Sequence, residues 1–154
     1  MNRESQAGFT YLGLMIILAI IGVAAAGTLR MGAVLQRHAN EEELLAIGLD
    51  FRAALRDYAR ATQGAGSTAP HSLDDLLRDP RYPNPRRYLR QIPVDPLTGR
   101  PVWGLVLAPD GASIIGIHSL SKARPIKIAN FPLVFRDFEA KASYADWIFV
   151  AGAD

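Results

Sequence analysis

The sequence predicts an α+β protein in which a long N-terminal α-helix packs on a small antiparallel β-sheet. Three patterns in the 154 residues carry this prediction. An uncharged apolar run comes first, an amphipathic helical pattern without proline follows it, and short β-branched runs separated by turn residues fill the C-terminal third. A chain of this length supports one domain with a core of its own and is too short for two ordinary domains.

The first half of the predicted helix is apolar on all sides. No charged residue lies between Glu4 and Arg30, and the apolar segment extends over residues 9–29. At about 1.5 Å per residue this segment reaches roughly 30 Å as a helix, which is close to the thickness of a hydrocarbon core. We therefore expect residues 9–29 to form a membrane-spanning helix.

The second half of the helix, residues 30–62, is amphipathic. Its apolar residues recur at spacings of three and four, which places them on one helical face, and charged residues fill the other positions. We expect this face to pack against the sheet, and the glycine-rich residues 64–67 to end the helix. The residues of the packing face are Leu44, Ile47, Phe51, Leu55 and Tyr58.

Residues 63–154 read as a small globular head. The pattern of residues 71–77 predicts a short helix capped by Ser72. Residues 102–107 and 113–119 predict a hairpin around the turn Pro-Asp-Gly, and the aromatic and β-branched run 144–150 predicts a third strand. We therefore expect the chain to form a long helix followed by an antiparallel sheet.

The N-terminus has three interpretations. It could be a plain membrane anchor with a coiled stalk. It could also be a removable secretory signal, since the small residues Ala24 to Ala26 fit a cleavage pattern, although Glu4 offsets the positive charge of Arg3. In that alternative, cleavage after Ala26 releases a secreted soluble binding domain. The third interpretation depends on the position of Gly8 directly before the apolar run.

Residues 8–12, Gly-Phe-Thr-Tyr-Leu, resemble the processing site of the type IV pilin and type II secretion pseudopilin family. The resemblance implies that a leader, residues 1–8, is cut after Gly8 on the cytoplasmic side and that the new N-terminal Phe9 is methylated. It also implies a pilin-like fold, whose stem helix enters the filament core. The residues of this membrane and assembly helix are Phe9, Leu12, Gly13, Leu14, Ile16, Ile17, Ile20 and Ile21.

Gly13 departs from the family pattern, which has a glutamate four residues after the methylated phenylalanine. In that family the glutamate is thought to pair with the terminal amine of a neighbouring subunit. Gly13 has no side chain for such a pair. Either another contact sets the register of the filament, or the subunit occupies an unusual place such as the tip.

A second resemblance lies in the head. Residues 95–99, Asp-Pro-Leu-Thr-Gly, with Trp103-Gly104 and then residues 116–119, Gly-Ile-His-Ser, are similar to the connector and hairpin of major pseudopilins. The chain has no cysteine, so it lacks the C-terminal disulfide loop common in adhesive pilins. The resemblance implies an inner-membrane, single-pass subunit with its head in the periplasm. Its implied partners are other pilin or pseudopilin subunits, a prepilin peptidase and the secretion assembly platform.

Nothing in the sequence predicts catalysis, a cofactor or nucleic-acid binding. His38, His71 and His118 have no partners at metal-ligand spacing, and a net charge of +2 does not indicate a nucleic-acid partner. A stalked hydrolase using Ser119 and His118 is a rival hypothesis. Major pseudopilins often bind calcium, but Asp137, Glu139 and Asp146 lack a dense acidic loop, so we expect no metal and read them as solvated acids. We read a cluster of arginines as a hydrated face with local ion pairs: Arg78, Arg81, Arg86, Arg87 and Arg90.

Overall fold

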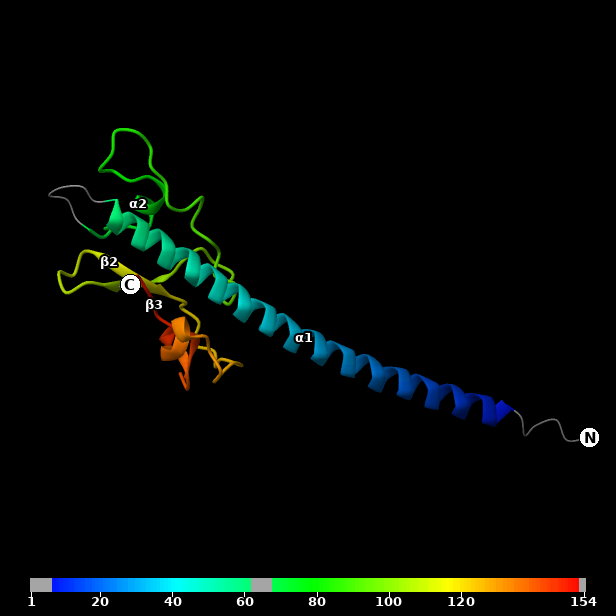
Figure 1. Ribbon diagram of the computed structural model, residues 1–154. Coiled ribbons are helices and arrows are strands. Elements are labelled where there is room, and N and C mark those ends of the chain that lie inside the picture. Colours follow the sequence, from blue (N-terminus) through cyan, green and yellow to red (C-terminus); the bar gives the residue numbers. More distant parts are fainter. Residues whose placement is uncertain (1–6, 62–67, 153–154) are drawn as a thin grey trace, which may run out of the picture. The chain divides into compact units, whose positions relative to one another are not determined.

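The computed structural model describes residues 7–61 and 68–152, with side chains for all of these except residues 7–10 and 24–31. The chain divides into two compact units, residues 1–38 and 39–154. The fold is α+β, with one long helix and a three-stranded antiparallel sheet (Figure 1).

Helix α1 extends from Ala7 to Arg60, as the uninterrupted helical pattern predicts. Residues 7–38 of the helix belong to the first unit and residues 39–60 to the second, which we call the head. The predicted end of the helix at Thr62 and the glycine-rich stop at residues 64–67 lie outside the described residues.

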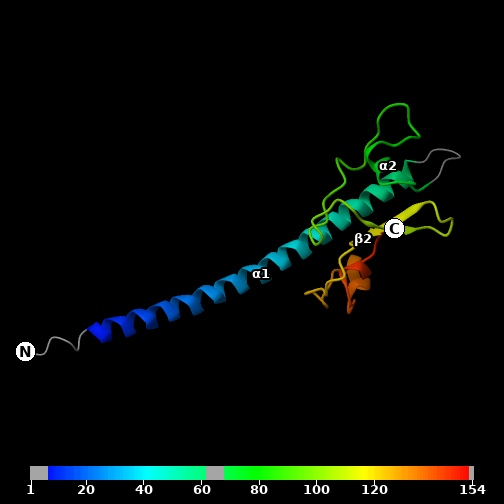
Figure 2. The ribbon, with the colours of Figure 1, turned by 180° about the vertical axis from the view of Figure 1, so that it is seen from behind.

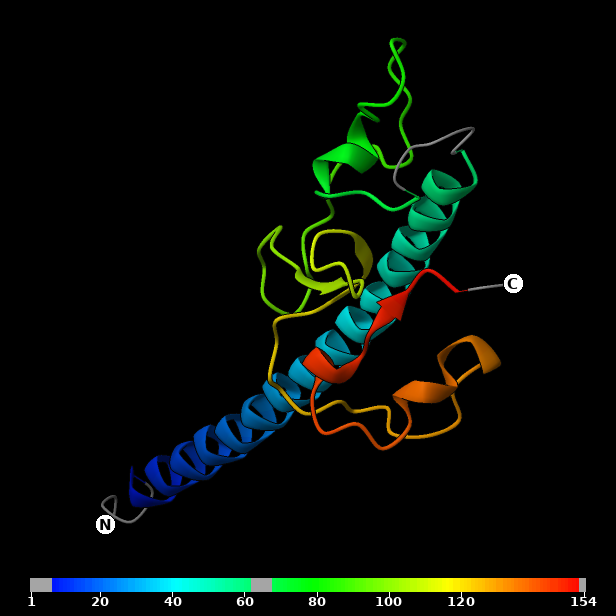
Figure 3. The same cartoon turned by 90° about the vertical axis from the view of Figure 1, so that its left-hand side faces the viewer.

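The head contains strands β1 (Gly104–Leu107), β2 (Ile114–His118) and β3 (Phe149–Val150) in the order β1-β2-β3. Ile117 pairs with Leu105 on one side and with Phe149 on the other, so these three side chains share one face of the sheet. Figure 3 shows β3 running beside the head portion of α1. The hairpin turn contains Gly111, whose φ of +69° is left-handed and suits glycine.

A single core forms between α1 and the face of the sheet. Phe51 contributes from the helix, Ile114 and Ile117 from β2, and Trp147 and Phe149 from the C-terminal segment. Much of the core is aromatic: the Phe138 and Trp147 rings stack with centroids 5.3 Å apart. Phe138 belongs to the 3₁₀ helix η1 (Leu133–Phe138), an element that the sequence pattern did not predict.

The third strand is shorter than predicted. Residues Tyr144–Asp146 form a 3₁₀ turn, η2, and only the last two residues of the predicted run pair with β2. The cause is local: the Ser143 hydroxyl donates to Asp146, and the Asp146 carboxylate accepts the Ser143 N–H at 2.9 Å. This capping box favours a helical turn over a strand.

Helix α2 (Asp74–Leu77) is also shorter than predicted, and its cap differs. The Ser72 hydroxyl donates to Asp75 at 3.3 Å, while the Asp75 carboxylate accepts the N–H groups of His71 and Ser72. Only the acidic half of the predicted capping box is therefore made. Figures 1 and 2 show α2 and the segment after it on one side of the head portion of α1, with the sheet on another.

Candidate functional site

The first candidate site is the apolar segment of α1 between Tyr11 and Val23. Its large hydrophobic side chains are between 47% (Met15) and 76% (Val23) exposed. Leu14 to Leu18 are exposed in succession, and five consecutive residues pass around the whole helix, so no face of it is covered. An apolar patch of this size marks a surface that binds another apolar surface.

The predicted assembly residues Leu12, Leu14, Ile16, Ile17, Ile20 and Ile21 all belong to this segment and are all exposed. Among the residues that the structure describes, no helix reaches the combination of length and apolar character needed to cross a bilayer. Gly8 and Phe9 lie in the first turn of α1, and leader residues 1–6 lie outside the described part of the chain. A Cβ added at Gly13 would meet no atom within 4 Å.

The second candidate site is the face of α1 that carries the head. Leu44, Phe51, Leu55 and Tyr58 are all at most 2% exposed, and Ile47 is half-buried against the same core. The tightest contact on this face is made by a residue that the apolar pattern skips. A Cβ on Gly48 would lie 2.1 Å from two ring carbons of Phe149, so α1 and β3 approach this closely only because Gly48 has no side chain.

The last turn of α1 is held by a buried ion pair. Asp79, with a side chain that is fully buried, accepts Arg81 Nε at 2.8 Å, Arg81 Nη2 at 2.6 Å and the Tyr88 hydroxyl at 2.8 Å. Arg81 also donates to the Tyr58 carbonyl at 2.9 Å and stacks over the Tyr58 ring. We call Asp79, Arg81, Tyr88 and Tyr58 the clamp. It ties the loop after α2 to the end of α1.

The clamp shifts the acidity of its members. The hydrogen bond from Arg81 lowers the pKa of Asp79 from 3.8 to about 2, against the opposing effect of burial. The same hydrogen bond raises the pKa of Arg81. Burial raises the pKa of Tyr88 to about 12, and the hydrogen bond that it donates to Asp79 acts in the same direction. Asp79 is therefore a carboxylate at any pH near neutral.

Glu41 anchors a second loop to α1. This residue is 3% exposed, and its Oε1 accepts the backbone N–H groups of Ile126 and Lys127, each at 3.1 Å. A carboxylate that satisfies two amides of one loop fixes the course of that loop. The Lys127 ammonium lies over the Phe131 ring, 5.1 Å from its centroid.

Replacing Glu41 should loosen this loop while sparing the clamp. In a Glu41→Ala variant two partly buried amides lose their acceptor, which costs about 1–3 kcal/mol. We expect hydrogen exchange of residues 122–131 to rise at least tenfold, with residues 76–90 unchanged. The exposed neighbour Glu42 supplies the control, Glu42→Ala. Equal exchange in both variants would show that the carboxylate does not hold the loop.

Ser119 and His118, the residues of the hydrolase hypothesis, face different partners. Ser119 is fully buried and its hydroxyl donates to the buried carboxylate of Asp95 at 2.7 Å. His118 Nδ1 lies 2.8 Å from the Ser119 carbonyl oxygen, and the His118 ring covers Gly104. The two side chains do not form a nucleophile–base pair. Asp95 also accepts the Leu97 N–H at 2.9 Å, so this network shapes the connector before β1.

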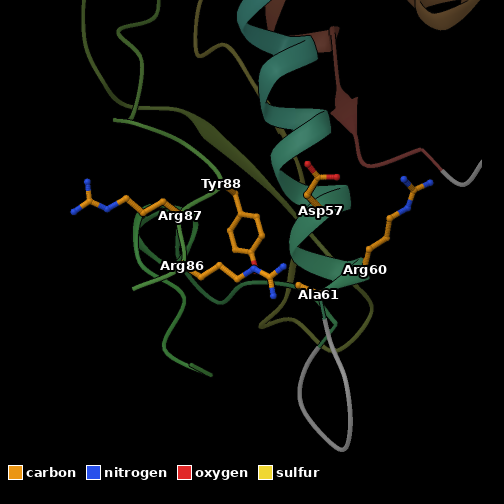
Figure 4. A pocket seen from close by; sticks show the side chains of 6 residues that line it. All are labelled: Asp57, Arg60, Ala61, Arg86, Arg87 and Tyr88. Atoms are coloured by element: carbon orange, nitrogen blue, oxygen red, sulfur yellow. The ribbon is translucent and has the colours of Figure 1, made fainter. Parts of the chain in front are cut away.

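Two residues of the predicted arginine cluster, Arg86 and Arg87, line an open pocket of about 370 Å³. Figure 4 shows Tyr88 projecting between α1 and the loop that carries Arg86, with Arg87 and Arg60 pointing away on opposite sides. Asp57 lies in the same lining, so charges of both signs meet there. Within residues 7–61 and 68–152, no group of three or more His, Asp or Glu residues could hold a metal ion.

Helix α1 thus contains an exposed apolar segment and, in residues 39–60, part of the core of the head, and the sequence is similar to that of a known protein. The chain is 29% identical over 130 residues to type II secretion system core protein G of Pseudomonas aeruginosa, covering 78% of this chain and 86% of that protein. The chain is pseudopilin-like. No family model matches the sequence, and no solved structure matches it.

The resemblance inferred from the processing site and the connector is thus confirmed for this pseudopilin-like chain. The sequence pattern did not predict three contacts: the close approach at Gly48, the clamp around Asp79 and the anchor at Glu41. Gly48 had a detectable signal, because a glycine inside an amphipathic helix often marks a close approach. The acids had none, since buried and solvated carboxylates look alike in a sequence.

Proposed function

We propose that this pseudopilin-like chain is a structural subunit of a type II secretion filament, and not an enzyme. The observation that carries the proposal is the exposed apolar segment Tyr11–Val23 on the same helix that carries the head. The similarity to core protein G supports it over most of the chain. Such a segment requires a second apolar surface, and a bundle of identical or related helices provides one.

In this proposal the chain is processed before it assembles. A prepilin peptidase cuts after Gly8, Phe9 becomes the methylated N-terminus, and residues 9–29 hold the subunit in the inner membrane with the head in the periplasm. Assembly by the secretion platform then exchanges lipid contacts for contacts between stem helices. Because lipid is as apolar as leucine, helix packing and not hydrophobic transfer drives that exchange.

The face of α1 that carries the head completes the proposal. Leu44, Ile47, Phe51, Leu55 and Tyr58 pack residues 39–60 of α1 into the core of the head. The clamp and the Glu41 anchor each tie one loop of the head to α1.

Single cysteine variants test the filament directly, since the natural chain has no cysteine. Leu18→Cys is placed in the exposed segment, and cells with the intact secretion system are treated with a membrane-permeant bismaleimide. We expect a ladder of cross-linked copies beyond the dimer. The ladder should disappear in a Gly8→Val, Leu18→Cys double variant, in which cleavage is blocked. No ladder, or a ladder that persists in the double variant, would refute assembly of the processed subunit.

Gly13 tests where in the filament the subunit sits. A glutamate side chain has room at this position, because no atom lies within 4 Å of the site of its Cβ. If the subunit belongs to the shaft, Gly13→Glu should supply the partner for a neighbouring terminal amine and increase co-assembly. At the tip the change should be neutral or harmful. The amount of the subunit in sheared filaments, with Gly32→Glu as control, separates the two positions.

A further inference from the structure

We propose that two copies of the chain pair through the free edge of β1, so that their three-stranded sheets join into one. In the described part of the chain β1 has a neighbouring strand on one side only, since the strand order is β1-β2-β3. The N–H and C=O groups on the other edge of such a strand are a template for a further strand. This pairing involves the head alone and does not depend on the proposed filament.

The free edge of β1 presents the backbone groups of Leu105 and Leu107. Along an antiparallel strand, successive residues direct their N–H and C=O groups to opposite sides. Ala108 faces β2, because its N–H donates to the Ser113 carbonyl at 2.8 Å, and Val106, two residues earlier, faces β2 as well. Leu105 and Leu107 therefore direct their backbone groups outward, where a second strand can bond to them.

The core layer of the head is open to solvent at this edge. Leu105 pairs with Ile117 and Leu107 pairs with Ile114, so the two leucines lie on the face of the sheet that forms the core. Ile114 and Ile117 are fully buried, whereas Leu105 is 44% exposed and Leu107 is 45% exposed. A further strand with apolar side chains on the same face would cover both leucines.

The edge also lacks the features that keep edge strands apart. Natural edge strands commonly carry charged side chains that oppose pairing. Residues 101–109 hold no charged residue. Pro101 and Pro109 have no N–H to donate, so they limit the pairing to residues 102–108 without preventing it.

A second copy of β1 is the occupant that fits this edge, because it repeats the same uncharged pattern. When two β1 strands lie antiparallel and centred on Val106, Leu105 of each copy lies opposite Leu107 of the other. Each leucine pair then exchanges two backbone hydrogen bonds, and the leucine side chains cover one another. The contact is two-fold symmetric and closes on itself, so it produces a dimer.

A disulfide tests the pairing, since the natural chain has no cysteine. The full chain with Val106→Cys is purified in neutral maltoside micelles and oxidised with copper phenanthroline. The two copies of residue 106 lie opposite each other with Cα atoms about 4.5 Å apart, which suits a disulfide, so we expect a covalent dimer as the main product. Ala108→Cys is the matched control on the same face of β1. Its two copies lie roughly 13 Å apart in the antiparallel pair, and we expect about tenfold less dimer.

A charge on the edge should prevent the pairing. Adding Leu105→Lys to Val106→Cys should lower the yield of dimer about tenfold. Adding Leu133→Lys, at an apolar residue that is 82% exposed elsewhere in the head, should leave the yield unchanged. Near-ultraviolet circular dichroism verifies that each variant is folded.

Three results would overturn the proposal. The absence of a dimer from Val106→Cys would show that a second copy does not occupy the edge, and would assign the edge to a strand of a different protein. Equal yields from Val106→Cys and Ala108→Cys would exclude an antiparallel pair centred on Val106. A yield that Leu105→Lys does not lower would show that the dimer forms without the edge.

Discussion

A Gly48→Ala variant is expected to unfold its head about 10 °C below the natural protein. The added methyl group would lie 2.1 Å from the Phe149 ring, far inside contact distance. That ring is fully buried and packs edge-on against Phe135 and Phe138, at 6.0 and 5.1 Å between centroids, so it has no space to move into. Overpacking of this kind costs about 3 kcal/mol, which corresponds to a shift of that order in a domain of this size.

The same substitution elsewhere on α1 provides the control. Gly32 has no atom within 4 Å of the site of its Cβ, so Gly32→Ala should stabilise the helix slightly, by up to about 1 kcal/mol. Trp103 and Trp147 are both buried in the head, and near-ultraviolet circular dichroism therefore follows unfolding of the head alone. Adding Phe149→Leu to Gly48→Ala should recover part of the loss. A Gly48→Ala variant as stable as the natural protein would refute the close approach of α1 and β3.

An Asp79→Asn variant is expected to lose about 2 kcal/mol of stability at pH 7. Asp79 has a pKa of about 2 in the folded protein, against 3.8 for the free group. A pKa difference of this size corresponds to about 2 kcal/mol through linkage. The asparagine also cannot form the ion pair that holds Arg81 over Tyr58. The exposed residue Asp74 supplies the control, since Asp74→Asn should change the free energy of unfolding by less than about 0.5 kcal/mol.

The pH dependence has a definite sign. Because the pKa of Asp79 is lowered by folding, its contribution is fully present above pH 4 and is lost as the pH falls through 3.8 toward 2. The natural protein should therefore lose stability more steeply over that interval than Asp79→Asn does. Asp110 titrates in the same interval, since hydrogen bonds from Ser113 and Ala112 lower its pKa to about 2, so the variant retains a smaller slope. Parallel curves for the two proteins would contradict the role of the clamp.

Periodicity predicted those parts of the fold that a single helix or hairpin determines by itself. The proline-free run through residue 60 predicted α1, and the Pro-Asp-Gly turn predicted the β1–β2 hairpin. The prediction was wrong for residues 144–148, where a local capping box between Ser143 and Asp146 outweighed the β-propensity of the run. It also missed η1, because Leu133 to Phe138 has neither helical length nor a clear period.

The residues of the candidate sites also divide into those that the sequence could identify and those that only the fold brings together. The apolar residues from Leu12 to Ile21 could be selected from the sequence alone, since they lie in one uncharged run that is visible without knowledge of the fold. The contact of Arg81 with the Tyr58 carbonyl, the Glu41 anchor and the Ser119–Asp95 contact join residues 23 to 86 positions apart in the chain. Spacing carries no information on such pairs, because the chain must fold before they meet.

The intact mass of the mature subunit, purified from the membranes of its own cells, determines whether the apolar segment is retained. We expect a chain of residues 9–154 carrying one additional methyl group on Phe9. That result would establish that the apolar segment is retained and that the bond after Gly8 is the one cut. A mature chain beginning at Gly27 would mean that the segment is discarded, and the filament function would then have to be abandoned.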